Sequence, residues 1–228
     1  MLLGPEAMDR LAQSSVAVFG IGGVGSYAAE ALARAGVGAL TLIDHDTVSE
    51  TNLNRQLCAL RSTVGRRKAE VMAERVSDIN PLCRVTPLCL RYSEDTKEQF
   101  FDRRYDYIID AIDLVSCKIS LILNALERRI PIISAMGTGN KLDPTQFEIT
   151  DLSRTAGCPL ARILRRELRE RGVLHHTVLY SREPPLSPAD AEAPPPGRRS
   201  VPGSVSWVPS CAGLMLAGYV VRQLIAKE

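Results

Sequence analysis

The sequence predicts an α/β fold with a doubly wound, mostly parallel sheet. Through the first two thirds of the chain, short apolar runs alternate with segments whose apolar residues recur every three or four positions. Such alternation is typical of parallel strands joined by helices that cover both faces of a sheet. The second observation is a glycine-rich turn after the first apolar run, where doubly wound sheets bind their ligands. At 228 residues the chain is long enough for one domain with a substantial core.

The expected strands are short and apolar, and the expected helices are longer and amphipathic. The strands are Val16–Gly20, Leu40–Asp44, Arg84–Leu88, Tyr107–Asp110 and Pro131–Ala135. The helices are Ser26–Ala35, Gly65–Ile79 and Val115–Arg129. A further strand is expected over Phe147–Asp151, followed by a helix over Pro159–Arg171 with proline in its first turn.

The last third of the chain changes in composition. Residues Glu183–Gly203 hold seven of the fourteen prolines, which predicts a flexible loop without regular structure. Beyond it, Ser204–Pro209 alternates polar and apolar residues, and Cys211–Ile225 predicts a buried helix. We therefore divide the chain into a nucleotide-binding domain, residues 1–152, and an appendage, residues 153–228, that continues the same domain.

The composition argues against several classes of protein. With 45% hydrophobic and 24% charged residues it is that of an ordinary globular protein, and a net charge of +2 indicates no general affinity for nucleic acids. Met1–Gln13 lacks the cationic start and apolar core of a signal peptide, so we expect a cytoplasmic protein without a membrane span. The six cysteines form no Cys-x-x-Cys pair, which predicts reduced thiols and no structural zinc.

A nucleotide-binding motif follows the first strand. It consists of Gly20, Gly22, Gly23 and Gly25, set between that strand and an alanine-rich helix. Glycine lets the backbone turn sharply and approach a phosphate, and the free amides at the helix N-terminus attract negative charge. The second strand ends on Asp44, where a Rossmann-like fold places a carboxylate against a ribose hydroxyl. The alternative is a tight turn that only lets helix and strand pack closely.

Residues that suit a triphosphate follow the second and fourth strands. Arg55 can hold a phosphate through two N–H groups, and Lys68 can act as a second positive charge, although either alone could be a solvated surface cation. Asp113 can hold a magnesium ion beside the phosphates, or it can cap the helix that begins near Val115. A dehydrogenase needs neither a phosphate clamp nor a metal-binding carboxylate, so the combination favours ATP over NAD.

These motifs together resemble the ThiF/MoeB superfamily, which is related to the ubiquitin-activating enzymes and adenylates carboxylates. The resemblance spans about residues 8–150 and rests on the glycine motif, Asp44-x-Asp46, Asn52-x-Asn54-Arg55-Gln56, Gly65-x-x-Lys68 and Asp110-x-x-Asp113. It implies that residues 1–152 are an ATP-binding adenylation domain and that the protein is a homodimer. Arg55, Lys68 and Asp113 would be catalytic, and Asp113 would bind Mg²⁺. The further ATP-binding residues that it implies are Asp44, Asp46, Asn52 and Gln56, besides the four glycines.

Segments further along resemble one branch of that superfamily, the bacterial tRNA threonylcarbamoyladenosine dehydratases. They are Asp143–Gln146, Ile149–Leu152, Pro159–Ala161 and Val178–Glu183. This resemblance implies a tRNA substrate whose threonylcarbamoyl group is cyclised with ATP, and a sulfur-relay partner from a cysteine desulfurase system. Family members commonly receive a phosphate-contacting arginine from the neighbouring subunit, just before the first helix. At that place this chain reads Met1-Leu-Leu-Gly, which makes Arg10 the alternative.

Three other functions stay open. One is adenylation of the C-terminus of a sulfur-carrier protein, against which the missing Cys-x-x-Cys pairs argue, because members of that kind usually carry two such pairs for zinc. Another is an NAD-binding protein or dehydrogenase. The third is a non-catalytic scaffold for sulfur transfer that keeps a nucleotide only as structure.

Arginines cluster in the predicted helix Pro159–Arg171. Those on its outer face could bind RNA phosphates, or they could form a solvated face paired with Glu167 and Glu170. Helical spacing places Leu160, Ile163, Leu164 and Leu168 inward. The candidate RNA-binding residues are Arg162, Arg165, Arg166 and Arg169, with Arg154 and Arg171 beside them.

Two cysteines are candidates for a sulfur nucleophile. Cys158 follows the predicted sheet, where related activating enzymes place such a nucleophile, and Cys211 is expected to open the last helix, whose amides would lower the thiol pKa. The alternative for all six cysteines is a small buried apolar side chain.

Overall fold

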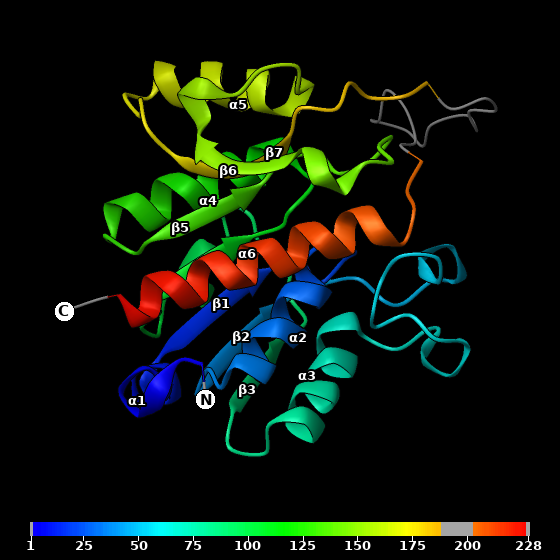
Figure 1. Ribbon diagram of the computed structural model, residues 1–228, viewed down its shortest axis with the longest axis vertical. Coiled ribbons are helices and arrows are strands. Elements are labelled where there is room, and N and C mark those ends of the chain that lie inside the picture. The colour runs from blue at the N-terminus through cyan, green and yellow to red at the C-terminus, as the bar shows by residue number, and fades with distance from the viewer. Residues whose placement is uncertain (1, 188–202, 227–228) are drawn as a thin grey trace.

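The computed structural model describes residues 2–187 and 203–226, which form a seven-stranded sheet between two layers of helices (Figure 1). The strand order is β3-β2-β1-β4-β5-β7-β6, and neighbouring strands are parallel except for β6 and β7. The predicted fold class is confirmed. The strands are β1 (Ser15–Phe19), β2 (Ala39–Ile43), β3 (Arg84–Leu88), β4 (Tyr107–Asp110), β5 (Ile132–Ala135), β6 (Phe147–Asp151) and β7 (Thr177–Ser181).

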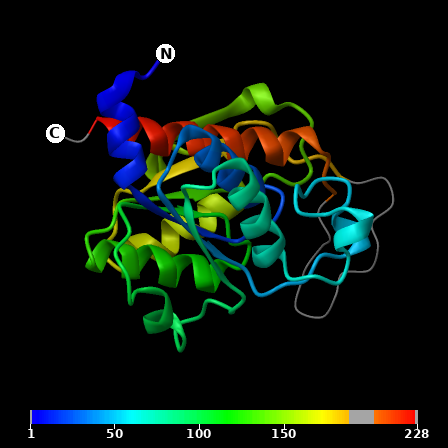
Figure 2. The same cartoon turned by 90° about the horizontal axis from the view of Figure 1, so that it is seen from below.

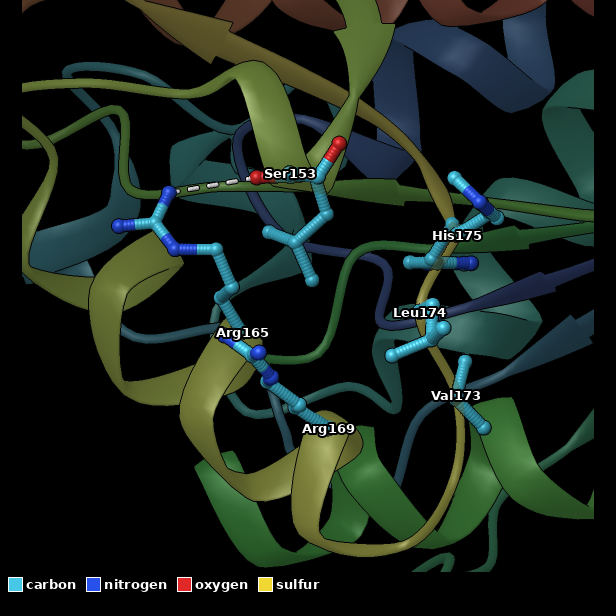
Figure 3. A pocket seen from close by; sticks show the side chains of 8 residues that line it. Ser153, Arg165, Arg169, Val173, Leu174 and His175 are labelled. Atoms are coloured by element: carbon cyan, nitrogen blue, oxygen red, sulfur yellow. Dashed lines mark hydrogen bonds between the residues drawn. The ribbon is translucent and has the colours of Figure 1, made fainter.

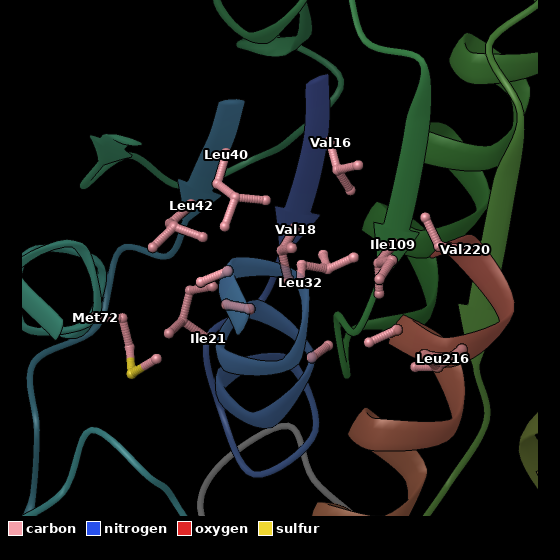
Figure 4. Close-up of a cluster of buried hydrophobic side chains, with 14 of the residues drawn as sticks. Val16, Val18, Ile21, Leu32, Leu40, Leu42, Met72, Ile109, Leu216 and Val220 are labelled. Atoms are coloured by element: carbon pink, nitrogen blue, oxygen red, sulfur yellow. The ribbon is translucent and has the colours of Figure 1, made fainter. Parts of the chain in front are cut away.

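Helices cover both faces of the sheet. One apolar cluster joins one face to α2, α3 and α6, and a second cluster joins the opposite face to α4 and α5. In the first cluster, Val18 and Ile109 of neighbouring strands lie close to Leu32 of α2 and Leu216 of α6 (Figure 4). The α-helices are α1 (Gly4–Gln13), α2 (Gly25–Ala35), α3 (Lys68–Ile79), α4 (Val115–Glu127), α5 (Pro159–Glu170) and α6 (Trp207–Ile225). Short 3₁₀ helices are η1 (Glu50–Asn52), η2 (Arg61–Thr63), η3 (Lys97–Phe100), η4 (Pro144–Gln146) and η5 (Leu152–Arg154).

The long helix α6 packs closely against α2. A Cβ added at Gly213 would lie 2.3 Å from the carbonyl oxygen of Val24, so only glycine allows this approach of the two backbones. By length and composition α6 could cross a membrane, but its Val208, Leu216 and Val220 are fully buried in the core. The predicted buried helix is thus part of the layer that covers the sheet.

Two predicted boundaries were wrong by several residues. Helix α3 begins at Lys68 rather than Gly65, because Gly65 has a left-handed backbone (φ +86°) and its N–H donates to the carbonyl of Val48. Helix α6 begins at Trp207 rather than Cys211, so the second half of the alternating segment Ser204–Pro209 already belongs to the helix. Pro209 fits there because the first turn of a helix leaves its N–H groups unpaired.

One α-helix and one strand were not predicted. One is α1, and the other is β7, which inserts between β5 and β6 and therefore places part of residues 153–228 in the same sheet as residues 1–152. Residues 188–202 of the predicted loop Glu183–Gly203 lie outside the described residues. The described ends of that loop are held, since Glu183 accepts the N–H of Leu142 at 2.9 Å and the N–H of Gly203 donates to Asn140 Oδ1 at 2.6 Å.

Candidate nucleotide site

A cavity of about 690 Å³ opens at the carboxyl edge of the sheet, where β1 and β4 are neighbours. The strand order reverses at this point, because the chain passes from β1 outward through β2 and β3 and returns to β4 on the other side. Ligands of doubly wound sheets bind there. The predicted ATP-binding residues that line the cavity are Gly20, Gly22, Gly23, Asp44, Asp46, Asn52, Arg55, Gln56, Lys68 and Asp113; Gly25 is the exception.

The glycine turn brings the backbone of β1 against the segment that follows β4. Gly20 has φ +89°, and a Cβ there would lie 2.6 Å from the carbonyl oxygen of Ala111. Gly25 serves the turn itself, since a Cβ would lie 1.8 Å from the carbonyl oxygen of Gly20. Gly25 therefore allows the close packing of helix and strand in a tight turn, whereas Gly22 and Gly23 line the cavity.

The N-terminus of α2 lies beside this cavity, because its N-cap residue Val24 lines the cavity. Val24 makes no side-chain capping bond. The positive end of the helix dipole is therefore not covered by a capping side chain. Ser26 accepts the N–H of Leu57 at 3.2 Å and donates to the carbonyl of Gly22 at 2.6 Å, which ties the turn to the polar loop after β2. This is the geometry that binds phosphate groups.

Asp44 is held at the end of β2 by two backbone amides. Its carboxylate accepts the N–H of Ile21 at 2.7 Å and that of Asp46 at 2.8 Å. The side chain is thus fixed between the glycine turn and the polar loop, and each oxygen keeps a lone pair for a further donor. A ribose hydroxyl is a donor of the right kind.

Lys68 is buried, not a solvated surface cation. Its side chain is 7% exposed, and Nζ donates to Asp46 Oδ2 at 3.0 Å. Since an ammonium group has three N–H donors, this bond leaves donors for a phosphate. The surface-cation alternative is therefore wrong for Lys68.

Arg55 and Asn52 come from the loop around η1. Arg55 Nη1 donates to the carbonyl of Thr51 at 2.8 Å and to Asn54 Oδ1 at 2.9 Å, so the guanidinium is positioned by uncharged groups. Asn52 is buried, and its Oδ1 accepts the N–H of Ser49 at 3.1 Å. This bond shapes the turn that presents Arg55.

The two aspartates after β4 have different environments. Asp110 is fully buried and accepts a bond from Lys118 Nζ at 2.7 Å, with Lys118 also fully buried. Asp113 is exposed and lines the cavity. The N-cap position of α4 is Leu114, so Asp113 lies one residue before the cap position.

The carboxylates of the cavity have the chemistry of a magnesium site. Asp44, His45 and Asp46 can each offer a ligand atom within 4.8 Å of one another, while Asp113 lines the same cavity from the segment after β4. Mg²⁺ favours one or two carboxylates together with water and phosphate oxygens. This donor set fits, and Asp113 as the ligand stays a prediction.

The described cysteines lie mostly in the core. Burial raises the pKa of the Cys58 thiol to about 11, which opposes thiolate formation. Cys158 is 7% exposed and lies at the N-cap of α5. Cys211 does not open α6 but lies four residues beyond its first residue, Trp207, so the argument from helix amides does not apply.

The arginines of α5 differ in their surroundings. Arg165 is half-buried rather than exposed, and its Nη1 donates to the carbonyl of Thr155 at 2.7 Å. Arg166 forms an ion pair with Glu167 at 2.7 Å. Arg162 and Arg169 are exposed and have no ion pair within the described part of the chain. Ile163, which the spacing placed inward, is 38% exposed.

Sequence reasoning missed part of the cavity wall. Leu90, Arg91 and Tyr92 follow β3 and line it, and their position after a parallel strand was a signal that could have found them. Thr138 and Ser204 also line it, without any local motif. Arg10 lies elsewhere: it donates to the carbonyl of Ile225 at 2.7 Å, where α1 lies beside the end of α6 (Figure 2).

Comparisons with known proteins find similar sequences and structures. A family model described as the ThiF family matches residues 1–228. The chain is 46% identical to a tRNA threonylcarbamoyladenosine dehydratase of Bacillus subtilis, over 99% of this chain and 92% of that protein. The crystal structure of the E. coli tRNA N6-threonylcarbamoyladenosine dehydratase in complex with ATP matches with a TM-score of 0.89 and 40% identity, covering 99% of this chain and 91% of that one. A sulfur carrier protein adenylyltransferase of Thermus thermophilus is 30% identical, over 99% of this chain and 71% of that protein.

Proposed function

This chain belongs to the ThiF family, and we propose that it catalyses the ATP-dependent dehydration of threonylcarbamoyladenosine next to the tRNA anticodon. The observation that carries the proposal is the convergence of the glycine turn, Arg55, Lys68 and Asp113 on one cavity. The chain in which they converge matches tRNA threonylcarbamoyladenosine dehydratases over nearly its whole length.

The cavity suits ATP in a defined orientation. We propose that Asp44 accepts the ribose hydroxyls, and that the phosphates lie over Gly22, Gly23 and the first turn of α2. Arg55 and Lys68 then reach the phosphates from the loop after β2 and from the start of α3. Their fixed positive charges stabilise the negative charge that develops as the α-phosphorus is attacked.

The reaction needs an activated carboxylate, because a carboxylate expels oxide or hydroxide too slowly near neutral pH. In the proposed first step a carboxylate oxygen of the threonylcarbamoyl group attacks the α-phosphorus of ATP, forming an acyl adenylate and releasing pyrophosphate. An internal nitrogen or oxygen of the modified base then attacks the acyl carbon, AMP leaves with the C–O bond electrons, and a proton is lost. The net change in the nucleoside is the loss of one water, and no protein nucleophile is required.

Magnesium is the cofactor that the donor set favours. We propose that Asp113 holds it, in a cavity that Asp46 also lines. When bound, Mg²⁺ supplies neutralisation of phosphate charge. Asp113 lines the cavity from the segment after β4, where it would hold the ion beside the phosphates.

We further propose a homodimer that works in the cytoplasm on tRNA, with a cysteine desulfurase system as sulfur-relay partner. A dimer would allow a neighbouring subunit to add a phosphate-contacting arginine to the cavity. Within one subunit Arg10 cannot do so, because α1 precedes β1 and therefore lies at the amino edge of the sheet, opposite the cavity.

The deciding experiment is mass spectrometry of nucleosides from threonylcarbamoyladenosine-containing tRNA after incubation with this protein, ATP and Mg²⁺. An ATP-dependent loss of one water supports the proposal. No loss, combined with pyrophosphate exchange when a small carrier protein ending in Gly-Gly is supplied, would instead make the protein a sulfur-carrier adenylyltransferase, as its likeness to the Thermus thermophilus enzyme allows. Tight NAD binding without pyrophosphate release would indicate a nicotinamide-binding protein.

A further inference from the structure

A second cavity of about 380 Å³ lies between α5 and the segment that leads into β7 (Figure 3). Arg165 and Arg169 of α5 stand on one side of it, and Val173, Leu174 and His175 stand on the other. We name this cavity the α5 pocket. It shares no lining residue with the nucleotide cavity among the described residues.

The α5 pocket lies away from the nucleotide cavity. Its lining segments are the end of β6 and the approach to β7, and β7 runs parallel to β5, so β7 begins at the amino edge of the sheet. The nucleotide cavity lies at the carboxyl edge. Helix α5 ends shortly before β7 begins, so its last turn lies near the amino edge.

The wall of the α5 pocket combines apolar surface with positive charge. Leu152 is buried beneath it, Val173 is half-buried, and Leu174 is 60% exposed. Arg165 bonds only to uncharged oxygens, and Arg169 has no ion pair in the described part of the chain.

Acidic groups near the α5 pocket are already engaged. Asp151 lies 3.3 Å from His175, and Glu167 pairs with Arg166 and Arg171. Glu170 lies 4.0 Å from Arg166. Neither Arg165 nor Arg169 pairs with a carboxylate within the described part of the chain.

This combination fits a nucleotide. A flat base can cover the apolar surface, and a guanidinium can bind a phosphate or stack on a base. The volume is near the lower end of the ~300–1,000 Å³ range of small-molecule sites, which suits a single nucleotide and is too small for a paired stem. Exposed Arg162 precedes Arg169 along α5 and also has no ion pair in the described part of the chain, so it adds positive charge to the same helix.

We propose that the α5 pocket holds one unstacked nucleotide of the RNA substrate, with its base against Leu152, Val173 and Leu174 and its phosphate on Arg169. The proposal rests on the proposed function, because that function requires an RNA partner. A free nucleotide has the same chemistry, so the test separates the two sources.

The experiment measures binding of a fluorescent anticodon stem-loop RNA while saturating ATP occupies the nucleotide cavity. Ser153 lines the pocket and is exposed. The variant Ser153→Glu therefore adds a negative charge to the pocket, and Ser153→Gln adds a side chain of similar size without charge. Arg169→Ala removes the proposed phosphate contact. Arg34→Ala is the charge control, because Arg34 lies on α2, which covers the opposite face of the sheet.

We expect Ser153→Glu and Arg169→Ala to weaken RNA binding about tenfold or more, and Ser153→Gln and Arg34→Ala to stay within about twofold of the unchanged protein. Arg169→Ala should also lower the slope of log Kd against log salt by about 0.7–0.9. Equal RNA affinity of Ser153→Glu and Ser153→Gln would overturn the proposal. Uridine monophosphate is the second probe: if Ser153→Glu abolishes its binding and leaves RNA binding unchanged, the ligand is a free nucleotide and the RNA assignment is wrong.

The nucleoside assay separates this proposal from the proposed function. If the unchanged protein dehydrates modified tRNA but Ser153→Glu binds RNA as Ser153→Gln does, only the pocket assignment fails. If the unchanged protein binds the stem-loop through the pocket but never dehydrates the nucleoside, the proposed function fails and the pocket assignment stands.

Discussion

The buried ion pair between Lys118 and Asp110 supports a prediction about stability. Both side chains are fully buried, and Lys118 Nζ lies 2.7 Å from Asp110 Oδ2. Lys118→Met keeps an unbranched side chain of similar length, so it leaves little cavity but removes the only charge in the described structure that bonds to this carboxylate. Asp110 is then buried without its partner. Removing one member of a buried ion pair costs about 3–5 kcal/mol, a large share of the ~5–15 kcal/mol that stabilises a typical domain.

The assay is urea unfolding followed by circular dichroism, with the double variant Asp110→Asn/Lys118→Met as control. Asparagine keeps an oxygen for the N–H of Ile112, which Asp110 Oδ1 accepts at 3.1 Å, and it carries no charge. We expect the double variant to recover at least about half of the lost free energy of unfolding, because no unpaired charge stays buried. A loss below about 1 kcal/mol in Lys118→Met, or a double variant less stable than the single one, would refute the reasoning.

Three further predictions concern pH, catalysis and packing. Burial, and secondarily the charge of Lys118, lowers the pKa of His176 to about 4 from the ordinary 6.5, so the folded protein prefers neutral histidine. The unfolded chain therefore binds a proton first as the pH falls, and about 3 kcal/mol of stability present above pH 6.5 should be lost between pH 6.5 and 4. Unfolding free energies across this range measure it, and His176→Gln should flatten the dependence; an unchanged slope contradicts the assignment. Asp113→Asn should lower nucleoside dehydration about 100-fold or more while the urea midpoint stays unchanged, and an active variant would remove its proposed role. In α6, Gly218→Ala should raise the free energy of unfolding by about 0.5–1 kcal/mol, because the added Cβ would meet no neighbouring element within 4 Å. Gly213→Ala should lower the free energy of unfolding, because its Cβ would lie 2.3 Å from the carbonyl oxygen of Val24. Thermal unfolding that ranks the two variants in the reverse order would contradict this packing.

The sequence predicts the nucleotide cavity well because its residues follow successive strands of one sheet. Strands Arg84–Leu88 and Tyr107–Asp110 occur with the predicted bounds, and parallel strands present their carboxyl ends at one edge. Polar residues after β1, β2 and β4 must then lie near one another. Arg91 and Tyr92 follow the same rule after β3, although no motif marks them.

Other features depend on contacts between distant parts of the chain. Lys118 lies among apolar residues of α4, and no local pattern indicates that its charge meets Asp110. His176 bonds to Ser134 at 2.8 Å, a pair separated by α5 and β6 in the chain. Strand β7 was not predicted, and its place between β5 and β6 depends on pairing between segments that are distant in the chain.

The charge balance of the nucleotide cavity explains why ATP binding should need more than this subunit's described residues supply. Three carboxylates, Asp44, Asp46 and Asp113, line it together with three cations, Arg55, Lys68 and Arg91. Asp46 also neutralises part of the charge of Lys68 through their 3.0 Å bond. A triphosphate adds several negative charges to a cavity whose own charges nearly cancel, and repulsion from the carboxylates opposes it. Magnesium held by Asp113 would offset part of this repulsion, and an arginine from a neighbouring subunit would add further positive charge. ATP affinity should therefore fall when Mg²⁺ is chelated. It should fall less in the variant Asp46→Asn, because one source of repulsion is gone. An equal loss of ATP affinity on chelation in the unchanged protein and in Asp46→Asn would refute this account.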